Sequence, residues 1–105
     1  MDVYIFISQP MRDRTEGEII AEREKAINEA KLHFVEDDNV VVIDSLLKDC
    51  KPESARCTAL MYLGKSIQLM ADADAVCFAP GWKEARGCRI EHECAREYGK
   101  HIIYL

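Results

Sequence analysis

The chain has 105 residues, of which 49% are hydrophobic and 31% are charged, a composition typical of one small globular domain. Its net charge of −5 argues against binding to nucleic acid polymers, which requires a concentrated positive surface. The charge does not exclude a nucleotide, because a few arginines and a helix N-terminus can hold one phosphate. No apolar run approaches the ~20 residues of a membrane span, so we expect no membrane association.

The cysteines and the N-terminal segment indicate the compartment. The five cysteines fall outside any CxxC pattern, and no Cys or His pair has the spacing of a zinc finger. The chain begins with a strand-like segment and lacks the basic and apolar regions of a signal peptide. We therefore expect a single cytoplasmic domain over residues 1–105, with reduced thiols, no metal and no cofactor.

Short apolar runs alternate with helical patterns along the chain. The runs predict four strands, over residues 3–7, 40–43, 75–79 and 102–105. They are apolar throughout, which is typical of strands covered on both faces in a parallel sheet. The periodic patterns between them predict helices over residues 15–34, from about 53 to 71, and 87–98. The first helix opens with the capping box Thr15-x-x-Glu18, and Gly99 closes the last.

The order βαβαβαβ predicts a three-layer, doubly wound α/β domain of the flavodoxin-like or Rossmann-like kind. Its four-stranded parallel sheet is expected to have the strand order 2-1-3-4. In the second helix we expect one stripe to face the sheet, formed by Leu60, Leu63, Ile67 and Met70. Further apolar side chains lie off this stripe, and they predict a homodimer or a higher homo-oligomer: Met61, Tyr62 and Leu69.

Glu91 breaks the pattern of the third helix. It falls on the stripe that should pack against the sheet, together with Ile90, Cys94 and Ala95. A carboxylate there is unfavourable unless it is paired or lies beside a cleft, and ligands of such sheets bind beyond the carboxyl ends of the strands. Glu91 is therefore a candidate functional residue. The alternative is a half-exposed boundary residue paired with Arg12 or Arg86.

The residues around Glu91 carry a family resemblance. The segment GCRIE (87–91), followed by Ala95, resembles the GTxxE…A signature of the nucleoside 2-deoxyribosyltransferases and of the related deoxynucleoside 5′-monophosphate N-glycosidases. The segment ISQPM (7–11) resembles that family's first-strand motif, and DAV (74–76) resembles its third strand. The likeness covers nearly the whole chain. It is strongest to a short subfamily associated with phages and prophages.

The resemblance implies an enzyme that acts on nucleosides or nucleoside 5′-monophosphates. Glu91 would attack C1′ of the sugar and displace the base, which gives a glycosyl-enzyme. Water then completes hydrolysis, whereas a second base completes transfer. The helix N-terminus and Arg12 or Arg86 are expected to keep Glu91 ionised. The alternative is a non-catalytic module of the same fold that binds or sequesters a nucleotide.

Three positions depart from the resembled family. Its sugar-contacting acidic or hydroxyl residue, six positions before the glutamate, is Ala85 here, and its second carboxylate is replaced by Ser66. An aromatic residue of the first strand often helps to orient the family's nucleophile, and Phe6 aligns there without a hydroxyl. The nucleophile is therefore present without its usual helpers, which favours the non-catalytic alternative.

Side chains near the predicted strand ends complete the candidate substrate-binding set. Arg12 could bind a phosphate or stay exposed, and Trp82 could stack on a base or serve as a lid or interface residue. Asp44 could bind a ribose hydroxyl or cap the following turn, and the Ser8-Gln9 donors could serve a ligand or a turn. The set is Ser8, Gln9, Pro10, Arg12, Asp44, Gly81, Trp82, Arg86 and Gly87.

Overall fold

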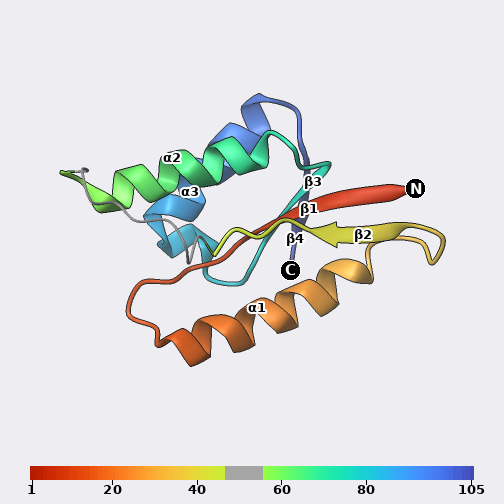
Figure 1. The fold of residues 1–105 in the computed structure, drawn as a ribbon, viewed down its shortest axis with the longest axis horizontal. Coiled ribbons are helices and arrows are strands. Elements are labelled where there is room, and N and C mark those ends of the chain that lie inside the picture. Colours follow the sequence, from red (N-terminus) through yellow and green to blue (C-terminus); the bar gives the residue numbers. More distant parts are fainter. Residues whose placement is uncertain (47–55) are drawn as a thin grey trace.

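The structure is a computed structural model that describes residues 1–46 and 56–105 (Figure 1). Its elements are β1 (Asp2–Ser8), α1 (Glu16–Lys31), β2 (Asn39–Val42), α2 (Thr58–Met70), β3 (Ala75–Phe78), the short 3-10 helix η1 (Trp82–Glu84), α3 (Arg86–Glu97) and β4 (His101–Tyr104). Apart from the start of the second helix, the predicted bounds agree to within three residues. That predicted start, near residue 53, lies outside the described residues, and the described helix begins at Thr58.

The four strands form one parallel sheet in the order β2-β1-β3-β4, which confirms the predicted fold class and strand order. Helix α1 covers one face, and α2 and α3 cover the other (Figure 1). Alternate residues of β1 serve the two faces: Ile5 and Ile7 pack with Ala26 and Ala30 of α1, whereas Phe6 packs with the layer that contains Ala95 of α3. Residues 5–7 of β1 and all of β3 are therefore apolar because both faces of the sheet are covered there.

The capping box at the start of α1 is confirmed. The Thr15 hydroxyl accepts a hydrogen bond from the Glu18 amide, and the Glu18 carboxylate accepts one from the Thr15 amide. At the other end of the fold, Gly99 follows α3 with φ of 68°, as a residue in the left-handed region after a helix should.

Removal of the α1 cap should lower stability measurably. Thr15→Ala leaves the Glu18 amide of α1 without its side-chain acceptor, so the free energy of unfolding should fall by about 1 kcal/mol. Urea denaturation at neutral pH checks this. Thr58→Ala is the matched control, because Thr58 is an exposed threonine at the start of α2 and is not the N-cap residue. Equal losses in the two variants would contradict the capping role.

One prediction about the second helix is wrong. Leu60 does not face the sheet, because 65% of its surface is exposed, whereas Met70 at the far end of α2 is buried. Leu69, which was expected off the inward stripe, packs against the buried cluster that contains Met70. The inward face of α2 is thus rotated from the predicted one. The homo-oligomer interface stays a prediction.

Candidate active site

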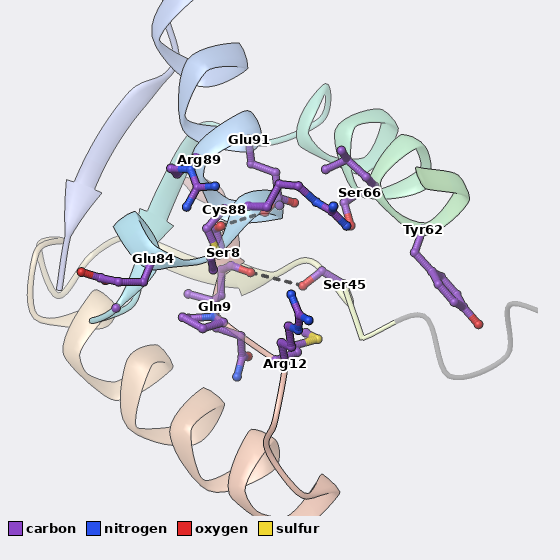
Figure 2. Close-up of a pocket in the computed structure, with 18 of the residues that line it drawn as sticks. Ser8, Gln9, Arg12, Ser45, Tyr62, Ser66, Glu84, Cys88, Arg89 and Glu91 are labelled. Carbon is purple, nitrogen blue, oxygen red and sulfur yellow. Dashed lines mark hydrogen bonds between the residues drawn. The ribbon is translucent and has the colours of Figure 1, made fainter. Parts of the chain in front are cut away.

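A cavity of about 820 Å³ opens beyond the carboxyl ends of the sheet, between the loop after β1, helix α2 and the start of α3 (Figure 2). Eight of the residues predicted from the sequence line it: Ser8, Gln9, Pro10, Arg12, Gly81, Arg86, Gly87 and Glu91. The three positions that depart from the resembled family, Phe6, Ser66 and Ala85, line it as well. The strand-end rule for doubly wound sheets therefore located the cavity.

Glu91 is buried in the wall of this cavity, with 7% of its surface exposed. The Ser8 hydroxyl donates a hydrogen bond to Glu91 Oε1 over 2.8 Å, across 83 residues of chain. The alternative of a half-exposed residue paired with Arg12 or Arg86 is therefore wrong. The cavity-lining carboxyl is held by a neutral hydroxyl at the end of β1.

Burial raises the pKa of Glu91 to about 7, and the hydrogen bond from Ser8 partly opposes this rise. The expectation that the helix N-terminus and Arg12 or Arg86 keep Glu91 ionised is therefore met only in part near neutral pH. Desolvation outweighs the groups that favour the ionised form. Among the described residues, no arginine side chain forms an ion pair with the Glu91 carboxylate. Near neutral pH the carboxyl is present in both protonation states.

The inward face of α3 differs in part from the predicted stripe. Cys88, Glu91 and Ala95 are the buried residues of the helix, and their spacing places them on one face. Ile90, which was expected beside Glu91 on that face, is 38% exposed. Cys88 lines the cavity one turn before Glu91, although it is not in the binding set given above. Figure 2 shows Cys88 and Glu91 close to Ser8 at the end of β1.

Gln9 and Gly81 shape the loops around the cavity. Gln9 is buried, and its Nε2 donates to the Ile19 carbonyl of α1 over 3.0 Å, which ties the loop after β1 to that helix. Its Oε1 has no hydrogen-bond partner among the described residues. Gly81 has φ of 87°, and a Cβ there would lie 3.5 Å from Cγ of Pro10, so the loops after β1 and β3 lie in contact.

Four arginines line the cavity together with three acidic residues: Arg12, Arg14, Arg86 and Arg89, and Asp13, Glu84 and Glu91. Arg14 is paired with Glu22 over 3.0 Å, and Arg89 donates to the Lys83 carbonyl. Helix α3 begins at this cavity without a side-chain cap and without an acidic residue in its first turn. Its free amides add to the positive potential of the arginines.

Asp44 and Trp82, two of the predicted binding residues, do not line the cavity. The Asp44 carboxylate accepts a hydrogen bond from the Leu46 amide over 3.3 Å, which is the turn-capping alternative. Trp82 stacks on His92 with a centroid distance of 4.2 Å and also contacts Phe78. The structure therefore places both side chains in local structural contacts instead of beside a base or ribose in the cavity.

Arg23 and Ser45 support the site from α1 and from the segment after β2, and neither is in the binding set predicted above. Arg23 of α1 is buried and donates to the Ser45 hydroxyl over 3.0 Å and to the Ile43 carbonyl over 2.9 Å. Ser45 lines the cavity after β2. The available signal was the spacing of Arg23 from Ala26 and Ala30, which places all three on the inward face of α1.

Other kinds of site have little support in the described part of the chain. Residues 1–46 and 56–105 contain no group of three His, Cys, Asp or Glu side chains that could hold a metal ion. None of the described helices combines the length and apolar character of a membrane span.

The comparisons with known proteins identify a family, but that family has no assigned activity. No curated protein is significantly similar to this chain. The model of the family DUF4406, described as a domain of unknown function, matches residues 4–104. This match covers nearly the whole fold, from β1 to β4. The chain therefore belongs to the DUF4406 family.

Proposed function

We propose that this protein is an N-glycosidase or 2-deoxyribosyltransferase that acts on nucleosides or nucleoside 5′-monophosphates, with Glu91 as its nucleophile. The observation that carries the proposal is the buried Glu91 carboxyl, held by Ser8 in the wall of a cavity of about 820 Å³. A cavity of this size suits a nucleotide, since small-molecule sites commonly span about 300–1,000 Å³. The resemblance of residues 87–91 to the deoxyribosyltransferase signature supports the same chemistry.

The ionised form of Glu91 is the reactive one. Its carboxylate oxygen bonds to C1′ of the sugar while the glycosidic C–N bond breaks, and the bonding electron pair leaves with the base. The base takes up a proton, and a glycosyl ester remains on Glu91. Water or a second base then attacks C1′, loses a proton and releases the carboxylate. Burial of Glu91 favours this chemistry because a weakly hydrated carboxylate is a stronger nucleophile than a solvated one.

The rim of the cavity favours a substrate with a phosphate. The arginine side chains and the uncapped start of α3 provide positive potential and free amides. A 5′-phosphate bound there would place the sugar over Glu91, so we favour hydrolysis of a nucleoside 5′-monophosphate over transfer between free nucleosides.

A non-catalytic nucleotide-binding or nucleotide-sequestering module is the second candidate. Phe6, Ser66 and Ala85 favour it, because they line the cavity in place of the orienting and proton-donating groups of the resembled family. Such a module would use the same arginine rim and would leave Glu91 without a chemical role.

One experiment separates the two functions. The protein is incubated with deoxynucleosides, ribonucleosides and their 5′-monophosphates; free base is measured by chromatography and the glycosyl adduct by intact mass. Base release that Glu91→Gln abolishes supports the enzyme. Tight binding of a nucleotide without release, unchanged in Glu91→Gln, would contradict the enzyme and support the binding module.

Arg12→Ala should weaken recognition of the phosphate. Loss of one charge-assisted contact is expected to raise KM for a 5′-monophosphate about 10-fold and to leave KM for the matching nucleoside nearly unchanged. Initial rates with both substrates check this. Arg96→Ala is the control, because Arg96 is paired with Glu93 and Glu97 at the other end of α3, outside the cavity. Equal effects on both substrates would exclude a phosphate contact.

A further inference from the structure

The face of β1 that carries Phe6 continues to the cavity through Ser8. Side chains alternate along a strand, so Phe6 and Ser8 project from the same face of the sheet. Phe6 packs there against Val76 and Ala95 in the layer beneath α3. Ser8, the last residue of β1, lies one step further toward the carboxyl ends of the strands and reaches Glu91. The Ser8 hydroxyl is therefore present on this face. It lies two residues after Phe6, which aligns with the orienting aromatic residue of the resembled family.

The single proton of the Ser8 hydroxyl has a defined acceptor. Ser8 is 1% exposed and donates to Glu91 Oε1 over 2.8 Å. The Cys88 thiol also lies within hydrogen-bonding reach of this hydroxyl, and it is 3% exposed. Burial raises the pKa of that thiol to about 11, so the thiol is neutral and does not compete as a charged acceptor. The Ser8 hydroxyl therefore donates its proton to the hydrogen bond with the Glu91 carboxylate.

We propose that Ser8 is the positioning residue of Glu91: it fixes Oε1 through the hydrogen bond, so that Oε2 is the oxygen that attacks C1′. This inference rests on the proposed function. It assigns to Ser8 the orientation of the nucleophile, a role that Phe6 cannot fill because it has no hydroxyl. The neutral Cys88 thiol packs beside the Ser8–Glu91 pair and helps to keep water from it. Because the hydrogen bond also favours the ionised carboxylate, Ser8 couples the orientation of Glu91 to its protonation state.

The first test is the pH profile of base release in Ser8→Ala. Loss of the hydroxyl should move the acidic limb of kcat/KM upward by about one pH unit. At pH 9, where Glu91 is ionised with or without Ser8, kcat should stay about 10-fold below wild type because Glu91 is no longer oriented. A merely structural serine would not move the limb. Ser66→Ala is the matched control, since Ser66 lines the same cavity and makes no hydrogen bond to Glu91.

Ser8→Cys gives a second variant that keeps the size of the buried side chain. A thiol is a weaker donor than a hydroxyl, so the acidic limb should lie between those of wild type and Ser8→Ala. A limb at the wild-type pH in both Ser8 variants would overturn the positioning role.

A measurement without turnover distinguishes this inference from the proposed function. The Glu91 carboxyl of the full chain can be titrated by carbon-13 NMR, with Glu91→Gln identifying its signal. The midpoint should lie near pH 7 in wild type, higher in Ser8→Ala and unchanged in Ser66→Ala. One outcome is that wild type releases no base while the titration midpoint of Glu91 still moves in Ser8→Ala. The proposed function then fails, but the hydrogen bond by which Ser8 positions Glu91 is supported. A midpoint that is the same in Ser8→Ala and wild type would contradict the positioning of Glu91 by Ser8.

Discussion

Glu91→Gln should abolish base release, with kcat at least about 10³-fold below wild type, because a neutral amide cannot form the glycosyl ester. Glutamine preserves the size and shape of the side chain, and its amide can still hydrogen-bond Ser8, so the cavity should remain intact. Initial rates with the best substrate of the nucleotide panel measure the loss. Intact mass spectrometry should show the glycosyl adduct on wild type and none on the variant.

Glu93→Gln is the control for the loss of one negative charge on the same helix. The Glu93 side chain is 58% exposed and is paired with Arg96, away from the cavity. Its replacement should leave kcat within about a factor of two of wild type, since surface ion pairs contribute little. Base release by Glu91→Gln at the wild-type rate would exclude Glu91 as the nucleophile and leave the binding module as the better function.

The fold could be predicted because each of its signals is local. The runs around Ile5 and Val76 are apolar at every position, and this feature alone indicates strands covered on both faces. Thr15 and Glu18 form the predicted cap because both partners lie within one helical turn. Leu60 shows the limit. An apolar helix such as α2 offers more than one inward stripe, and packing against the rest of the fold selects one of them.

The sequence could predict which residues lie near the site, but not which of their side chains contact one another. The strand-end rule and the stripe of α3 identified Ser8 and Glu91 separately, yet their hydrogen bond joins residues 83 positions apart. The sequence left Trp82 open between a base and a lid or interface, because its partner His92 lies on another element. Arg23 carried no local signal beyond its spacing, because its acceptors are a hydroxyl and a backbone carbonyl after β2.

The burial of Glu91 should make the protein less stable as the pH rises. The pKa of this carboxyl is about 7 in the folded chain and about 4.3 in an unfolded one. Between these values the folded state holds a proton that the unfolded state has released. The free energy of unfolding therefore falls as the pH rises from about 4.5 through 7, and the loss is complete above that. The difference of the two pKa values corresponds to about 4 kcal/mol as an upper limit.

Glu91→Gln isolates this contribution, because the variant shares every other titrating group with wild type. At pH 8 the variant should unfold at a higher denaturant concentration than wild type, with a free-energy gain of up to about 4 kcal/mol. At pH 5 most of the gain should disappear, because the wild-type carboxyl is then protonated in the folded state. Urea denaturation of both proteins at the two pH values measures this gain, and the gain at pH 5 is then subtracted from the gain at pH 8. A gain that is equal at pH 5 and pH 8 would mean that Glu91 titrates like an exposed carboxyl. The low-dielectric site on which the nucleophile depends would then be absent.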